Sequence, residues 1–181
     1  TRLISLIISI SSLIIFLDIN FPVVNHLLIL SELFNYPIFN IIFFSLCLLA
    51  LANGCNFIDG MNGLLSFYLF GVVVSCFHLS YFIGDTESAK TLLMYGIFII
   101  FFISLNFPWG KIFLGDSGAY LLGILLGSWV INFFGQNEVI SSWNAVLIFF
   151  YPSAEVIYSF LRKILQKKSP FKPDREHLHL K

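Results

Sequence analysis

Three short polar clusters interrupt an otherwise apolar chain and hold most of the side chains that could do chemistry. They are Asn53–Gly63, Phe113–Gly118 and Asp174–His179. They are built from carboxylates, carboxamides, glycines, imidazoles and one arginine. Such groups hold divalent cations and phosphates in proteins. Together the clusters predict a metal and phosphate site, provided that the fold brings them to one place.

The first cluster carries a polar side chain at every third residue. These residues are Asn53, Asn56, Asp59 and Asn62. On successive helical turns they would share one face, and their oxygens suit Mg²⁺ or hydrogen bonds to a nucleobase or sugar. Gly54, Gly60 and Gly63 predict tight turns or close approach of a ligand. Because Asn, Asp and Gly also favour helix ends, a capped junction between two helices is an equal alternative.

The second cluster places Asp116 immediately before an apolar run. Asp116 could cap that helix, or it could hold a metal that bridges to phosphate at the helix N-terminus. Both interpretations stay open on the sequence alone. Lys111 is a candidate partner for the phosphate, although a lysine beside a membrane needs no such role.

The third cluster follows a basic stretch and two helix-breaking prolines, Pro170 and Pro173. Arg175 could bind a diphosphate through two parallel hydrogen bonds. His177 and His179 would point the same way in an extended segment. A zinc site lacks an accompanying cysteine, and a solvated basic tail on anionic lipid is the remaining alternative.

The elements that must position these clusters are membrane helices. The chain has 181 residues, of which 58% are hydrophobic and only 11% charged, and its mean hydropathy is +0.90. Soluble domains carry about 25% charged residues. Zero net charge gives no indication of a nucleic-acid partner. We therefore expect an all-α, polytopic membrane bundle that forms one domain over residues 1–181. Six spans are predicted: Leu3–Leu17, Ile38–Leu51, Leu64–Ile83, Thr91–Leu105, Tyr120–Phe134 and Trp143–Leu161.

Charge asymmetry between the connectors predicts their sidedness. Connectors 18–25, 84–90 and 135–142 carry four acids and one base, whereas 53–63, 106–118 and the tail from Arg162 carry eight bases. Excess Lys and Arg marks the cytoplasmic face. If six spans alternate, all three polar clusters lie on that face. His26–Tyr36 is too short to cross and is interpreted as interfacial or re-entrant.

Two features within the spans predict how the helices pack. Ala119, Gly123 and Gly127 recur every fourth residue, which favours close approach of another helix in lipid. Glu155 lies inside the last span, where a carboxylate is costly and marks a candidate functional group. Pro152 should kink that helix and free a backbone carbonyl.

Taken together, the clusters resemble the polyprenyl-phosphate N-acetylhexosamine-1-phosphate transferases. The resemblance rests on the asparagine-rich loop, then Phe-Leu-Gly-Asp-Ser-Gly, then Pro-Asp-Arg-Glu-His-Leu-His. The last motif is closer to the N-acetylglucosamine branch than to the muramoyl branch. In place of a further His that often ends this motif, the chain has Leu180.

The resemblance implies roles for individual residues. Asn56 and Asp116 would hold Mg²⁺, with Mn²⁺ as an alternative. Asp59, Asp116 and His177 would be catalytic. Substrate-binding roles would fall to Asn53, Asn62, Lys111, Arg175, His177 and His179.

The implied reaction transfers N-acetylhexosamine 1-phosphate from a UDP-sugar to polyprenyl phosphate, which releases UMP and starts synthesis of a cell-envelope polysaccharide. The resemblance places the enzyme in the inner (plasma) membrane, with cytoplasmic active-site loops. Direct attack and a covalent aspartyl intermediate both remain open, as does a homodimer. A transporter and a non-catalytic subunit are rival classes. A transporter predicts charges deep in several spans, whereas only Glu155 is found.

One family feature is missing from the sequence. The family carries an Asp-Asp pair on a cytoplasmic loop upstream of the first cluster, and no Asp-Asp occurs in this chain. The chain also starts at Thr1 rather than Met. We therefore expect a fragment of a longer transferase that begins after this loop and is inactive by itself.

Overall fold

The fold is a bundle of helices in a computed structural model, which describes residues 2–23 and 32–167. Within these residues every regular element is helical. The elements are α1 (Arg2–Phe16), the short 3₁₀ helix η1 (Leu33–Asn35), α2 (Pro37–Ile58), α3 (Leu64–Phe82), α4 (Thr86–Asn106), α5 (Gly115–Gln136), α6 (Trp143–Ile148) and α7 (Phe150–Leu165). The predicted all-α membrane bundle is therefore confirmed.

Four helices, α2, α3, α4 and α5, are long and apolar enough to cross a membrane, and α1 is a shorter apolar helix. Two of them extend beyond the predicted spans into the polar clusters. Helix α2 continues to Ile58, so Asn53 and Asn56 are helical, and α5 already begins at Gly115, so Asp116 lies in its first turn. The predicted segment His26–Tyr36 lies partly outside the described residues.

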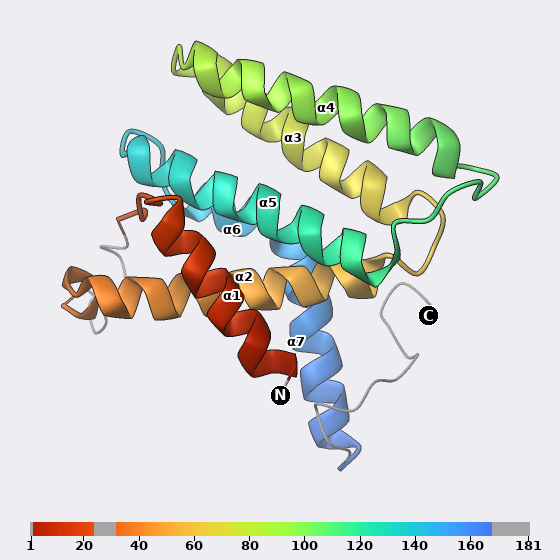
Figure 1. The fold of residues 1–181 in the computed structure, drawn as a ribbon, viewed down its shortest axis with the longest axis horizontal. Helices are drawn as coiled ribbons and strands as arrows, with labels where there is room; N and C mark the ends of the chain where they lie inside the picture. Colours follow the sequence, from red (N-terminus) through yellow and green to blue (C-terminus); the bar gives the residue numbers. More distant parts are fainter. Residues whose placement is uncertain (1, 24–31, 168–181) are drawn as a thin grey trace.

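The last predicted span, Trp143–Leu161, is wrong as one continuous helix. It is divided at Phe149 into α6 and α7. Proline has no backbone N–H, so Pro152 cannot bond to the carbonyl four residues earlier, and a helix bends at such a place. In the view of Figure 1, α7 turns away from the direction of the long helices and crosses α2.

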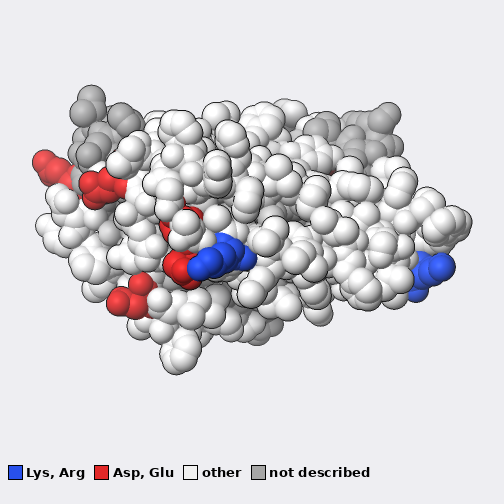
Figure 2. Space-filling model, turned by 90° about the horizontal axis from the view of Figure 1, so that it is seen from above, with Lys and Arg blue, Asp and Glu red and all other residues white. Residues whose placement is uncertain are grey.

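The two clusters within the described residues lie at the same end of the bundle. In Figure 1 the connection from α2 to α3 and the connection from α4 to α5 meet at the right-hand end, whereas the α3–α4 and α5–α6 connections lie at the other end. Figure 2 shows the acidic side chains in the left-hand half, one of them beside a basic side chain, and a further basic side chain at the right-hand end. This arrangement agrees with the alternation of spans that the sequence predicts.

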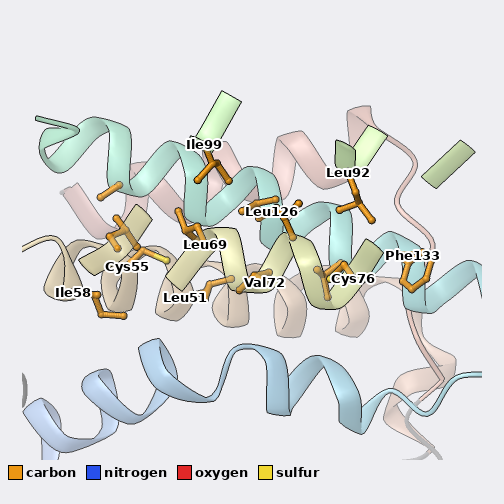
Figure 3. Close-up of a cluster of buried hydrophobic side chains, with 14 of the residues drawn as sticks. Leu51, Cys55, Ile58, Leu69, Val72, Cys76, Leu92, Ile99, Leu126 and Phe133 are labelled. Carbon is orange, nitrogen blue, oxygen red and sulfur yellow. The ribbon is translucent and has the colours of Figure 1, made fainter. Parts of the chain in front are cut away.

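The main core lies between α2, α3, α4 and α5. Figure 3 shows its side chains, among them Cys55 of α2, Leu69 of α3 and Leu126 of α5, all of which are fully buried. Figure 1 shows α3 and α4 side by side, and α5 next to α2. A second core joins α1 to α2 through Ile10, Ile14 and their neighbours.

The small residues of α5 bring it unusually close to α2, as the sequence predicts. A Cβ atom on Gly123 would lie 3.1 Å from Cys55 Sγ and 3.2 Å from Ala52 Cα. One turn further along, a Cβ on Gly127 would lie 2.6 Å from Leu48 and 2.7 Å from Leu51. Only glycine fits at either position without a shift of the neighbouring atoms. The two helices therefore pack in a defined antiparallel register.

Candidate functional site

The register of α2 against α5 brings the first two polar clusters together. Gly127 faces Leu48 and Leu51, and Gly123 faces Ala52 and Cys55. Moving four residues towards the N-terminus of α5 thus corresponds to moving four residues towards the C-terminus of α2. Continuing this register places the first turn of α5, which carries Asp116, opposite the last turn of α2.

A hydrogen bond between Asn53 of α2 and Tyr120 of α5 agrees with this register, about one turn away from the ends of the two helices. The Tyr120 hydroxyl of α5 donates to Asn53 Oδ1 at 3.2 Å, and Asn53 Nδ2 donates to the Leu49 carbonyl at 2.7 Å. These bonds satisfy the carboxamide within the helix pair, so Asn53 can remain helical at the edge of the apolar region. The structure therefore gives Asn53 a packing role, while its predicted contact with substrate stays a prediction.

Asp59 and Asp116 form the electrostatic centre of the site. Asp59 lies just after α2, and burial together with the negative charge of Asp116 raises the pKa of its carboxyl group to about 6. Asp116 is exposed in the first turn of α5. Two like charges close to each other favour the neutral form of one of them. They also form a site that a divalent cation would stabilise.

The donor set fits Mg²⁺ in kind. Asn56 precedes Asp59 by one helical turn at the end of α2, and both side chains are half-buried. Two carboxylates and an amide oxygen are hard oxygen ligands of the type that Mg²⁺ binds. Among the described residues, no three His, Cys, Asp or Glu side chains come together. Because of the oxygens that they carry, Asn56 and Asp116 stay the predicted metal ligands, with Asp59 beside them.

The two loops next to this pair are joined by Asn106, the last residue of α4. Its Oδ1 accepts a hydrogen bond from the Gly63 N–H at 2.6 Å, and its Nδ2 donates to the Ile112 carbonyl at 2.7 Å. Asn106 is buried. Asn106 is not among the predicted site residues, although an Asn at the end of a long apolar run must find partners when it is buried. Asn106 connects the loop after Asp59 to the loop before Asp116.

Asn62, in the connection from α2 to α3, also contacts the connection from α4 to α5. It is exposed, and its carboxamide packs so closely on Gly110 that a Cβ there would lie 2.8 Å from Asn62 Nδ2. Gly110 has a φ of +58°, which also favours glycine. The ammonium group of the exposed Lys111 lies 5.6 Å from the centre of the Trp109 ring. Asn62 and Lys111 are therefore both exposed in the loops next to Asp59 and Asp116, and their predicted contacts with substrate stay predictions.

Two glycines of the first cluster differ in role. Gly63 has a φ of +86°, in the left-handed region, and this supports the predicted tight turn. Gly54 instead lies within α2, where a Cβ would overlap the backbone of Pro152 in α7. The expectation of a turn or ligand approach at Gly54 is thus wrong. Its small size allows two helices to cross.

The remaining predicted residues are placed only in part. Glu155 is completely buried on α7. Arg175, His177 and His179 lie outside the described residues, so their approach to Asp59 and Asp116 stays a prediction. The structure thus brings two of the three clusters together.

The chain is similar in sequence to several curated proteins. The chain is 35% identical over 144 residues to an undecaprenyl-phosphate alpha-N-acetylglucosaminyl 1-phosphate transferase of Thermotoga maritima, covering 80% of the chain and 42% of that protein. An Escherichia coli protein with the same name is 30% identical, over 72% of the chain and 37% of its own length. A decaprenyl-phosphate N-acetylglucosaminephosphotransferase of Mycobacterium leprae is 28% identical, over 72% of the chain and 38% of its length.

The chain therefore spans about two fifths of the length of the curated relatives it matches. No solved structure shows a significant match. The family model described as glycosyl transferase family 4 matches residues 1–134, which is most of the chain. This match covers α1 to α5 almost completely and includes Asn56, Asp59 and Asp116. The chain belongs to glycosyl transferase family 4.

Proposed function

We propose that this chain is part of an enzyme that transfers N-acetylhexosamine 1-phosphate from a UDP-sugar to polyprenyl phosphate, with release of UMP. The names of the similar proteins support the reaction class, since each names an N-acetylglucosamine phosphate transferase that acts with a polyprenyl phosphate. The whole protein would carry out the reaction. Its product would start the synthesis of a cell-envelope polysaccharide.

One observation carries the proposal: Asp59 and Asp116 lie close enough for the charge of Asp116 to raise the pKa of Asp59. A protein gains nothing in stability from this repulsion. A cation offsets it, and phosphoryl transfer requires cations to neutralise charge on the phosphates. Asn56 and Asp116 would hold Mg²⁺, or Mn²⁺ as an alternative. When bound, the ion would neutralise the diphosphate of the nucleotide sugar.

The residues of the chain would mainly bind and orient the two substrates. A phosphate oxygen of the lipid attacks the sugar-linked phosphorus, a new P–O bond forms, and the P–O bond to UMP breaks. Lys111 and Arg175 would bind the diphosphate, and His177 and His179 would bind near the sugar and leaving phosphate. Asn62 would contact the uridine. Positioning and charge stabilisation supply most of the catalysis in such reactions.

The place of the site at one end of the bundle fits these substrates. A nucleotide sugar is soluble in water and a polyprenyl phosphate is held in lipid, so the two can meet only at the membrane surface. We assign this surface to the cytoplasmic side of the plasma membrane, because most Lys and Arg residues fall in the segments that alternation of the predicted spans assigns to this side.

The experiment incubates the full-length protein with UDP-N-acetylglucosamine, undecaprenyl phosphate and Mg²⁺ and measures UMP. We expect release by the wild type and a loss of about 100-fold or more in Asp116→Asn, as for other groups that stabilise transition-state charge. Asp85→Asn is the matched control, because Asp85 caps α4 at the opposite end of the bundle. No UMP from the wild type, or equal rates in both variants, would contradict the proposal.

A further inference from the structure

The break between α6 and α7 is stabilised by a tyrosine from a distant helix. Pro152 has no N–H to offer, so the Ile148 carbonyl lacks its usual partner four residues later. The hydroxyl of Tyr68 in α3 donates to that Ile148 carbonyl at 2.6 Å. Eighty residues separate the two in sequence. The carbonyl that the sequence analysis expects Pro152 to free is thus satisfied from outside its own helix.

Helix α2 also contacts the break between α6 and α7. Gly54 lies against Pro152, where a Cβ on the glycine would be only 2.8 Å from both the carbonyl carbon and the Cβ of Pro152. The rings of Tyr68 and Tyr151 also lie 5.9 Å apart. Contacts from α2 and from α3 therefore meet at one helical turn, around residues 148–152.

The direction of α7 depends on this turn. Beyond it, α7 buries Glu155, Ser159 and Arg162 along one face and packs against α2, which it crosses in Figure 1. From the end of α7 the sequence runs on to Arg175 and His177. A change in the break would therefore alter the position of the end of α7, from which the chain continues to this predicted motif.

We propose that Tyr68 is a positioning residue of the transferase: its hydroxyl holds the α6–α7 break and so sets the direction of α7. The kinetic part of this proposal rests on the proposed function. In hydrocarbon no water is present to bond the Ile148 carbonyl. If the Tyr68 hydroxyl is removed, a backbone arrangement that gives this carbonyl another partner is therefore favoured. Tyr68 acts through α7 and does not itself need to touch a substrate.

The first test compares Tyr68→Phe with wild type in the full-length protein by distances between spin labels. Labels on Gln136→Cys and Lys167→Cys report the ends of α5 and α7, with Cys47, Cys55 and Cys76 replaced by alanine. We expect a shifted or broadened distance distribution in Tyr68→Phe. Tyr81→Phe is the matched control, since Tyr81 lies on the same helix but is exposed at its far end, and its distribution should equal that of wild type.

The kinetic test separates positioning from general damage. Losing one hydrogen bond within a membrane changes an equilibrium by about 3- to 30-fold, so we expect KM for the UDP-sugar to rise by about that factor. The Mg²⁺ concentration for half-maximal rate should stay unchanged, because α2 and α5 hold the metal residues. Unchanged distances and kinetics, or lost activity with unchanged distances, would overturn the proposal.

Pro152→Ala supplies the second variant. The substituted alanine restores the N–H that can bond the Ile148 carbonyl, so adding Tyr68→Phe to Pro152→Ala should change neither distances nor KM further. An equal effect of Tyr68→Phe in both backgrounds would overturn the proposal, even if Tyr68→Phe alone folded poorly. If the wild type released no UMP, the proposed function would be wrong, whereas the label distances would still decide whether Tyr68 holds the break.

Discussion

Asp59 is a half-buried carboxyl group that the fold places beside another carboxylate. Its pKa is raised to about 6 by burial first and by Asp116 second. The folded protein therefore binds this proton more tightly than the unfolded chain does, in which the pKa is about 4. Ionisation of Asp59 lowers the stability of the fold, and this effect grows as the pH rises from about 4 to above 6. A residue that costs stability in this way is typical of a functional site.

This charge leads to a pH-dependent prediction. In full-length protein without divalent cations, Asp59→Asn should raise the Tm relative to wild type at pH 8, because the variant removes a charge that burial and the repulsion from Asp116 both destabilise. At pH 4 the wild-type carboxyl is mostly protonated, so the two Tm values should converge. Adding Mg²⁺ should reduce the Tm difference between wild type and Asp59→Asn at pH 8. Thermal unfolding followed by tryptophan fluorescence measures this, and a Tm difference independent of pH would contradict it.

Asn106 is the residue on which the connection between the two loops depends. Asn106→Ala would leave the Gly63 N–H and the Ile112 carbonyl without their present partner. Loss of a partner for a buried polar group costs about 1–3 kcal/mol, so the free energy of unfolding should fall by about that amount. UMP release should fall too, because the loops beside Asp59 and Asp116 lose their connection.

Asn144→Ala is the control for Asn106→Ala. Asn144 bonds only locally to the Ser141 carbonyl, at the other end of the bundle. Denaturant unfolding and limited proteolysis should show faster cleavage around residues 59–63 and 107–114 in Asn106→Ala alone. Equal behaviour of the two variants would show that Asn106 does not hold the loops.

At the scale of helices, the contact between α2 and α5 decides how far apart Asp59 and Asp116 lie. Gly123 is in contact with Ala52 and Cys55 where no larger side chain fits. Each helix is rigid along its length, so a larger distance between α2 and α5 at Gly123 would also increase the distance between Asp59 and Asp116. The packing glycines and the two carboxylates are thus parts of one arrangement.

We predict that Gly123→Val separates the two helices. Overpacking costs about 1–3 kcal/mol, and UMP release should fall more than this loss of stability explains, because the carboxylates move apart. Gly71→Val is the matched control, since a Cβ on Gly71 of α3 would meet nothing within 4 Å. Thermal unfolding and the transferase assay on both variants measure the two effects. Full activity in Gly123→Val would contradict the link between packing and the site.

At the scale of the whole molecule, the bundle has two chemically different ends. At one end, the connectors around Asp85 and Glu138 are acidic. The other end carries Asp59 and Asp116, and most of the basic residues come later in the sequence, from Arg162 onwards. The charge bias predicts that only the second end faces the cytoplasm. The proposed reaction requires the same orientation, because nucleotide sugars are cytoplasmic substrates in this scheme.

Cysteine labelling of intact cells tests this orientation. In an otherwise cysteine-free full-length protein, Glu138→Cys should react with a membrane-impermeant maleimide added outside. Met61→Cys, at an exposed position of the site end, should react only after the membrane is made permeable. Labelling of Met61→Cys in intact cells would contradict the topology and the placement of the site.

Much of this architecture follows from local properties of the chain. Long apolar runs need helices in lipid, because every backbone group must be bonded internally, so the all-α fold was predictable without tertiary information. The three-residue spacing of Asn53, Asn56, Asp59 and Asn62 predicted one helical face, but only Asn53 and Asn56 are helical, because α2 ends at Ile58. A kink near Pro152 was predictable because proline lacks the N–H that would bond the carbonyl four residues earlier.

Contacts between residues far apart in sequence were decided by tertiary packing. The pairing of α2 with α5, the loop connection through Asn106 and the bond from Tyr68 to the Ile148 carbonyl join residues separated by 43 to 80 positions. Gly54 looked like a loop glycine because its polar neighbours suggested a turn, whereas the crossing of α7 determines its role. Spacing along a chain encodes the face of a helix, but which faces meet depends on how side chains of different helices fit together.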